Sequence, residues 1–225
     1  TGTYFSDALY QNNVLQFAMT NWLYQILYQV PELNAMFLRR HRTCMERILQ
    51  PPGTPTNQLI WERRFDEMAD LLDPPGVTNS DAILDWQKWG TWAGSTNNFP
   101  ARTDIARVKA VHPPGRRDFL FNQNPQSNGQ PIPSTQPAVP LMRFGDLEVN
   151  PASGNQAQEY FVIRNMNGYA VDLSGWSVTG AVRYTFRPGT VVPAGGGHPQ
   201  YIGQIHVARN PKAFRARTSG ARSNE

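Results

Sequence analysis

Three aspartates stand about one helical turn apart in the first half of the chain. Asp66, Asp70 and Asp73 lie at positions i, i+4 and i+7, so a helix would place their carboxylates on one face. Carboxylate oxygens are the ligands that hard divalent cations prefer. Arg63 and Arg64 precede them by one turn, and such mixed charge is typical of a solvated helix face. We therefore expect an ordinary polar face here and no metal ligands.

A second candidate is a row of tryptophans at a spacing of three, Trp86, Trp89 and Trp92. Exposed indoles can stack on sugar rings, so this row could form a carbohydrate-binding surface. At helical spacing the same residues can instead fill a hydrophobic core. Both interpretations remain open from the sequence.

No arrangement of residues in the chain indicates catalysis. The histidines His41, His112, His198 and His206 are scattered, and none belongs to an HExxH or a Ser/His/Asp pattern. The glycines of residues 195–197 are not followed by Lys-Ser or Lys-Thr, which favours a turn over a phosphate-binding loop. We predict that the chain is not an enzyme and has no catalytic, cofactor-binding or metal-binding residue.

Composition limits the remaining classes. The chain has 225 residues, a formal net charge of +4 and one cysteine, Cys44, so neither an intramolecular disulfide nor a cysteine zinc cluster is possible. No apolar run is long enough for a transmembrane helix, and no secretory signal is visible within the sequence. The basic residues near the end form a solvated tail or contact a polyanion, and nucleic acid binding is not expected because few aromatics accompany them. They are Arg209, Lys212, Arg215, Arg217 and Arg222.

The elements that position these residues change in type along the chain. Apolar residues at spacings of three and four predict helices over residues 6–28, 31–49, 57–72, 80–90, 104–110 and 116–121, bounded by proline and glycine. In the second helix Arg39 and Arg40 are expected on the polar side. Residues 1–121 thus read as a helical, bundle-like segment.

The second half has a different pattern. Residues 122–140 are rich in Pro, Gln and Asn, which predicts an extended linker. Short runs with a period of two then predict strands around residues 147–149, 160–163, 171–173, 176–178, 184–186, 191–192 and 201–207. This spacing is typical of an antiparallel sandwich, so the fold class is α+β in two parts.

Four segments of the second half resemble the lamin tail domain. They are YAVDLSGW (169–176), YTFRPGTVVPAG (184–195), EYFVIRN (159–165) and LEVNP (147–151). The resemblance implies an immunoglobulin-like β-sandwich over residues 141–225, incomplete at its C-terminal end. Val171 and Leu173 would point inward, Gly175 would allow a tight turn, and Trp176 would be the large residue of the core. The family usually carries an acidic residue where this chain has Val162.

The residues that carry this resemblance are given structural and no catalytic roles. They are Glu159, Asn165, Val171, Asp172, Leu173, Gly175, Trp176, Phe186, Pro188, Gly189, Pro193 and Gly195.

The helical half resembles the C-terminal helical region of spore-coat-type CotH kinases. The resemblance rests on LYQILYQVPEL (23–33), FLRR (37–40) and RDFL (117–120). The acidic catalytic motifs of that family are not in this sequence. ATP and a divalent metal are therefore implied only for a parent protein with a kinase region upstream.

Together these observations predict a non-catalytic fragment that carries a lamin-tail interaction or anchoring module. By resemblance it belongs to a bacterial secreted or cell-surface CotH-like protein, and is extracellular or at the cell surface. A protein partner would bind the sandwich or its open edge at residues 201–207, since an unpaired strand edge accepts another strand. Two alternatives remain: part of an atypical secreted protein kinase with its catalytic residues upstream, and a carbohydrate-binding surface module.

Overall fold

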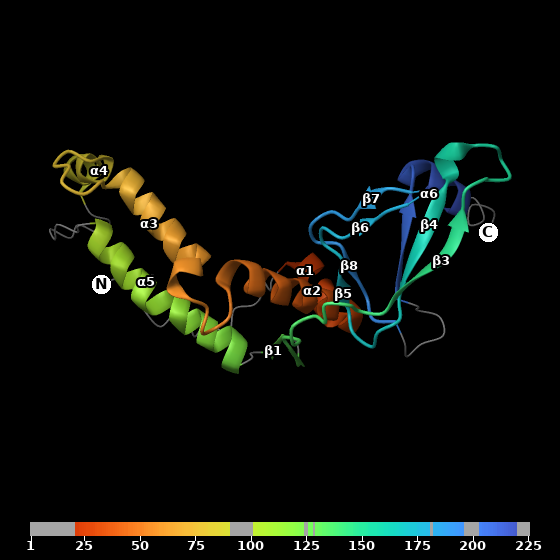
Figure 1. Ribbon diagram of the computed structural model, residues 1–225, viewed down its shortest axis with the longest axis horizontal. Coiled ribbons are helices and arrows are strands. Elements are labelled where there is room, and N and C mark those ends of the chain that lie inside the picture. Colours follow the sequence, from red (N-terminus) through yellow and green to blue (C-terminus); the bar gives the residue numbers. More distant parts are fainter. Residues whose placement is uncertain are drawn as a thin grey trace. The chain divides into compact units, whose positions relative to one another are not determined.

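The computed structural model describes residues 21–90, 101–123, 126–127, 129–180, 182–195 and 203–219 (Figure 1). The chain forms two compact units. The helical unit consists of residues 1–17 and 44–132, and the β-rich unit consists of residues 18–43 and 133–225. Both helices and antiparallel sheets are present, as the α+β prediction requires.

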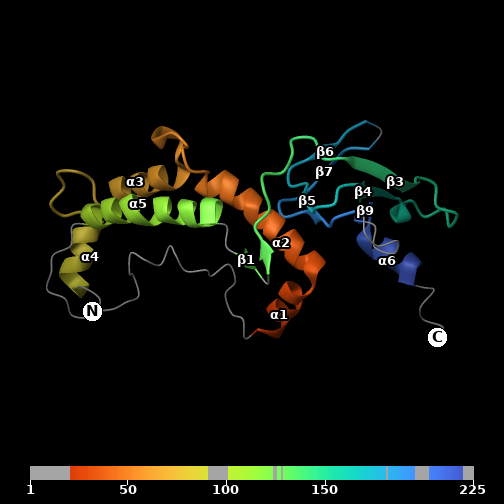
Figure 2. The same cartoon turned by 90° about the horizontal axis from the view of Figure 1, so that it is seen from below.

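The helical unit is built around two long helices. Its elements are η3 (Met45–Leu49), η4 (Thr56–Gln58), α3 (Ile60–Leu72), α4 (Asp81–Trp89), α5 (Ala101–Arg117), η6 (Asp118–Gln123), β1 (Gln126–Ser127) and β2 (Gln130–Pro131). Helices α3 and α5 lie side by side (Figure 2). They run antiparallel, because Glu62 near the start of α3 pairs with Arg117 at the end of α5.

The predicted helix boundaries at Ser80 and Gly90 are confirmed. The Ser80 hydroxyl accepts a hydrogen bond from the amide of Ile83 at 3.4 Å, as an N-cap residue does. Gly90 ends the helix with a φ of +68°, a conformation that glycine adopts without strain.

The start of α3 is later than predicted. The residues from Thr56 form a short 3-10 turn, and the α-helix begins at Ile60. The side chain of Gln50 decides this boundary: its oxygen accepts from the amide of Ile60 at 2.7 Å, and its NH₂ group donates to the Gln58 carbonyl at 2.8 Å. This cap comes from a residue outside the helix, so the helix sequence does not reveal it.

The prediction of separate helices at 104–110 and 116–121 is wrong. Helix α5 runs unbroken from Ala101 to Arg117 with Pro113 and Pro114 inside it, and η6 follows with wider turns. Proline removes a backbone hydrogen bond and normally breaks a helix. Here Pro113 is fully buried, and the contacts of Arg117 with Glu62 and with the Leu49 carbonyl hold the end of the helix in place.

The β-rich unit has two layers of strands with helices at its margins. Its helical elements are α1 (Trp22–Gln29), most of α2 (Pro31–Cys44), η7 (Gln156–Gln158) and α6 (Pro211–Ser219). Its strands are β3 (Met142–Glu148), β4 (Tyr160–Asn165), β5 (Val171–Asp172), β6 (Ser177–Val178), β7 (Tyr184–Thr185), β8 (Val191–Val192) and β9 (Gln204–Ala208). Each predicted strand region thus contains a strand.

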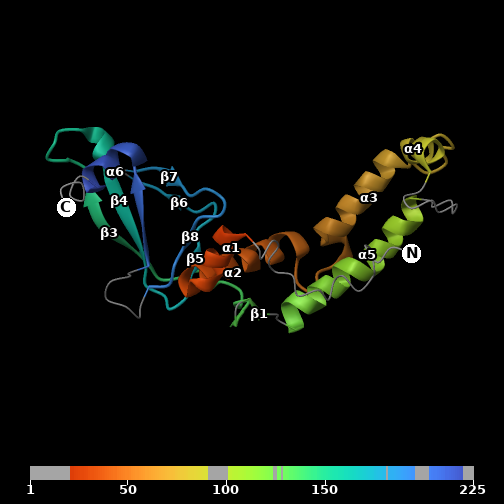
Figure 3. The same cartoon turned by 180° about the vertical axis from the view of Figure 1, so that it is seen from behind.

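The strands pair antiparallel throughout. Strands β3, β4 and β9 form one sheet in that order, with β3 and β9 at its edges. The second layer is a hairpin in which β5 pairs with β8 and β6 pairs with β7 (Figure 3). The core lies between the layers, and its buried residues are Phe161, Ile163, Val171, Leu173, Phe186 and Val192.

Two expectations about side chains in this unit are wrong. Trp176 is 38% exposed and lies at the margin of the core, whose centre is filled by Val171, Leu173 and Phe186. Arg39 is buried, because its guanidinium donates to the carbonyls of Ala170 at 2.9 Å and Ser134 at 2.8 Å. Helix periodicity assigns a charged residue to solvent and cannot indicate such distant acceptors.

Candidate functional site

Asn165 holds the turn after β4 from inside the unit. Its side chain is fully buried and donates to the carbonyls of Tyr169 at 2.8 Å and Pro193 at 2.7 Å. Its oxygen accepts from the amide of Asn167 at 2.9 Å. A Cβ on Gly195 would lie 1.5 Å from the Asn165 carbonyl oxygen, so only glycine fits there. Asn165 and Gly195 thus hold this turn by hydrogen bonds and by close backbone packing.

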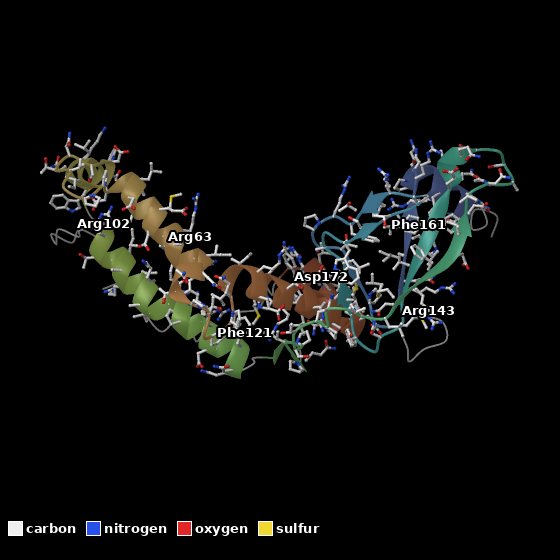
Figure 4. The ribbon with its side chains drawn as sticks, viewed as in Figure 1. Arg63, Arg102, Phe121, Arg143, Phe161 and Asp172 are labelled. Atoms are coloured by element: carbon white, nitrogen blue, oxygen red, sulfur yellow. The ribbon has the colours of Figure 1, made fainter. Side chains whose placement is uncertain are left out.

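Asp172 connects the hairpin to α2 (Figure 4). One carboxylate oxygen accepts from Arg40 at 3.1 Å, and the other accepts from the amide and the hydroxyl of Ser174. Burial raises the pKa of this carboxyl, but hydrogen bonds from Ser174, Thr43 and Arg40 outweigh burial and hold the pKa below its ordinary value. Every strong donor nearby is thus used by the fold, which leaves the carboxylate a structural group.

The outer edge of β5 is closed by side chains. The amide group of Gln136 accepts from the Asp172 amide at 2.8 Å and donates to the Asp172 carbonyl at 3.1 Å. Arg39 likewise donates a hydrogen bond to the carbonyl of Ala170. The residues before β3 that were expected to form a linker therefore seal a strand edge, and no partner can pair there.

The edge at β3 is different, because its core-facing side is uncovered. Phe144 lies opposite Ile163 and Leu147 lies opposite Phe161, so both side chains point to the face on which the core lies. Phe144 is nevertheless 66% exposed and Leu147 63% exposed, and Val149, just after the strand, is 58% exposed. The hairpin covers the β4 part of the sheet and leaves this row open.

Two hollows adjoin this row, on the side of the sheet that faces the β6–β7 part of the hairpin, and the larger one extends from the end of β3 across β4 to Val207 and Ala208 of β9. The larger, of about 340 Å³, is lined by Leu147, Val149, Phe161, Val182 and Tyr184 among others. The smaller, of about 140 Å³, is lined by Met142, Phe144, Ile163, Trp176 and Phe186 among others. We call this surface, with its two hollows, the β3 groove.

A row of aromatic rings in successive edge-to-face contact lines the groove. The rings of Phe144 and Phe161 are edge-to-face at 6.1 Å between centroids. Phe161 and Tyr184 are 6.2 Å apart, and Tyr184 and Phe186 are 5.1 Å apart, again edge-to-face. Such pairs are stabilising and hold each ring in a defined orientation. The groove is thus a preformed apolar surface.

The unpaired charge around the groove is positive. Glu148 pairs with Arg217 at 3.2 Å, and Glu159 pairs with Arg209 at 3.0 Å. Arg143 on β3 and Arg183 before β7 are exposed, and neither has a carboxylate partner among the described residues. An anionic group at the rim would therefore find a favourable field.

The remaining lamin-tail positions have local roles. Val171 and Leu173 are buried in the core, and Gly175 turns the chain with a φ of +79°, both as expected. Gly189 has a φ of +87° in the turn that follows Pro188, and its amide donates to Ser174 at 2.8 Å. Val162, where the family has an acid, is fully buried.

The three aspartates of α3 are held by partners of their own. Asp66 pairs with Lys109 and Asp70 with Arg102, while Asp73 accepts from Ser80. The three carboxylates thus lie on a polar face with partners of their own, and within the described ranges no group of three or more His, Cys, Asp or Glu side chains could hold a metal ion.

The two tryptophans of the row that the structure describes, Trp86 and Trp89, differ in exposure. Trp89 is 72% exposed and Lys88 lies over its ring at 5.1 Å, whereas Trp86 is half-buried. Trp92 lies outside the described residues, as do His198 and Arg222. In the basic C-terminal stretch Arg209 and Arg217 form ion pairs with Glu159 and Glu148, which uses part of the charge available to a polyanion.

Sequence reasoning missed the β3 groove. The alternation at Phe144, Leu147 and Val149 is visible in the sequence, but it is also the pattern of a covered strand.

None of the helices in the described part of the chain has the length and apolar character that crossing a membrane requires.

Comparisons with known proteins do not assign the chain to a family. Neither protein-family models nor curated proteins nor solved structures yield a match to it.

Proposed function

We propose that the chain is a non-catalytic protein-binding module whose binding surface is the β3 groove. In this proposal the β-rich unit is an immunoglobulin-like sandwich of the lamin-tail type, and it anchors or links a bacterial secreted or cell-surface protein. The four sequence segments that resemble the lamin tail domain support the type of module. The pairing of a three-stranded sheet with a hairpin across one core is compatible with it.

One observation carries the binding role: the apolar row on β3 faces the core side of the sheet and is still exposed. Exposed apolar side chains scattered over a surface need no explanation, but a contiguous patch with two hollows marks a binding site in many proteins. The polar clusters at Asp172 and Asn165 are internally satisfied, so they offer no comparable alternative.

The proposal can be tested by selecting peptides from a random displayed library on the intact chain. We expect enriched peptides to lose at least about tenfold in affinity on the Leu147→Asp variant, because a buried charge in an apolar contact is unfavourable. The matched control is Val139→Asp, which changes a residue that is 90% exposed in the same unit but does not line either hollow.

Circular dichroism of both variants checks that they are folded. The proposal is contradicted when the library yields no enriched peptide, or when Leu147→Asp and Val139→Asp bind the enriched peptides equally well.

A further inference from the structure

We infer that the β3 groove binds an extended peptide in which acidic residues alternate with apolar ones, added as a strand beside β3. This inference rests on the proposed function and names the chemistry of the partner. It follows from three independent features: the backbone of β3, the apolar hollows beside it, and the sign of the unpaired charge.

The backbone of β3 is open on one side. Strand β3 pairs with β4 only, and in the described ranges no strand lies on its other side. The edge of β5, by contrast, is closed, since the side chain of Gln136 forms hydrogen bonds with both the amide and the carbonyl of Asp172. Because a strand edge carries unpaired N–H and C=O groups, β3 can bind the backbone of an extended chain.

The shape of β3 places the two hollows at separate positions along this edge. Phe144 pairs with Ile163 and Leu147 pairs with Phe161, so Gly145 and Asp146 together lie opposite one residue of β4. This β-bulge bends the strand between the two hollows. The smaller hollow lies at Phe144 and the larger at Leu147, and apolar side chains that alternate along an extended peptide would reach both.

The charges beside the groove indicate which kind of peptide would bind. The acidic groups beside the groove are neutralised, Asp146 by Arg164 at 3.3 Å and Glu148 by Arg217. Arg143, which is labelled in Figure 4, and Arg183 remain exposed without a carboxylate partner among the residues described. Arg143 precedes the core-facing Phe144 on β3, so its side chain lies on the opposite face of the sheet, and carboxylates that lie between the inward apolar residues of an incoming strand would point to the same face and could pair with it. Arg183, on the hairpin, adds to the positive field at the larger hollow.

The same charges argue against a second copy of this chain as the occupant. Two β3 edges placed together would bring the Arg143 and Arg183 side chains of both copies to one interface, and like charges at an interface repel. A bulge is also a feature that discourages edge-to-edge pairing between copies.

The test uses the full chain and synthetic peptides in which valine alternates with glutamate. A matched peptide carries lysine in place of glutamate, and a third has methyl groups on alternate backbone nitrogens. Fluorescence anisotropy of labelled peptides measures affinity. We expect the glutamate peptide to bind at least about tenfold tighter than the lysine peptide, with a smaller difference at high salt.

Charge-neutral variants locate the contact. Arg143→Gln should weaken binding of the glutamate peptide, while the matched variant Lys212→Gln, which removes an exposed cation from α6 outside both hollows, should leave it unchanged. The methylated peptide should bind at least about tenfold more weakly, because it cannot donate its full set of backbone hydrogen bonds.

Equal binding of the glutamate and lysine peptides, or equal binding of the methylated peptide, would overturn the inference. The proposed function would still stand if peptides from the random library depend on Leu147. If no library peptide binds at all, the proposed function fails as well, so the two failures are distinguishable.

Discussion

Arginine residues have two different roles in this protein. Arg39 and Arg40 are neighbours on α2, and both bind the hairpin, one through backbone carbonyls and one through Asp172. Arg143 and Arg183 have no such partner among the residues that the structure describes, and they leave positive charge at the β3 groove. A charged residue thus stabilises the fold where acceptors meet it, and is available to a ligand where they do not.

The Asp172 carboxylate should make stability depend on pH. Its pKa in the folded chain lies below its ordinary value of 3.8, so it stabilises the folded state above that pH and loses this contribution as the pH falls through the folded pKa. Asp172→Asn cannot titrate. We expect it to cost about 1–3 kcal/mol at about pH 7 and clearly less at about pH 2.

Urea unfolding at both pH values measures the difference, with hydrogen exchange of residues 171–178 as the local probe. The control Asp85→Asn removes an exposed carboxylate of α4. A cost that is the same at both pH values would show that the carboxylate charge does not stabilise the hairpin.

At the scale of elements, one ion pair joins α3 to α5. Arg117 donates to Glu62 through two nitrogens at 2.5 and 2.8 Å and to the Leu49 carbonyl at 2.8 Å, and both charged side chains are nearly buried. Burial raises the pKa of Glu62, but the hydrogen bond with Arg117, a backbone hydrogen bond and the positive charges of Arg117 and Lys109 together outweigh burial and keep the pKa below its ordinary value. This pair fixes where α5 ends against α3, although two prolines precede it.

Removal of one partner should be costly. We expect Arg117→Leu to destabilise the helical unit by about 3–5 kcal/mol, because Glu62 is left as a buried charge. The double variant Glu62→Leu, Arg117→Leu should recover a large part of this loss.

Thermal unfolding followed by circular dichroism checks this prediction, and Arg63→Leu serves as the control, since that side chain is exposed on the same helix. If the double variant is as unstable as Arg117→Leu, packing and the contact with Leu49 would account for the loss, and the ion pair would not.

At the scale of the whole molecule, an unpaired strand edge favours self-association, whereas the positive net charge opposes it. Strand β9 lies at the other edge of the sheet and overlaps the run 201–207 that was expected to provide an open edge, and no strand pairs with its outer side in the described part of the chain. The formal net charge is +4. Like charge on two copies weakens association, and salt screens that repulsion.

Self-association through β9 should therefore increase with salt. We expect a larger dimer fraction at high than at low salt, and a smaller one for His206→Lys, which adds a cation to an exposed position of β9. Ile205 is less suitable for this test, since it packs against the core. Light scattering measures the dimer fraction, and a monomer in both salts would show that the outer side of β9 is covered.

Local patterns in the sequence determined most of the secondary structure. Ser80 and Gly90 predicted the ends of α4, and the period of two located the strands from β3 to β9, because these signals act between neighbouring residues. The inward positions of Val171 and Leu173 followed from the resemblance together with that period.

Only the tertiary structure decided which predicted faces are covered. Arg39 is buried because its hydrogen-bond acceptors lie more than 90 residues away in the sequence. Helix α5 continues past Pro113 because its last residue, Arg117, is bound by Glu62 of α3. The β3 row is apolar yet exposed, because the hairpin packs on β4 and stops short of it, and Trp176 of the hairpin lies at the margin of the core. Periodicity shows which side of a strand is apolar, whereas coverage depends on where a distant layer ends, and no local pattern contains that information.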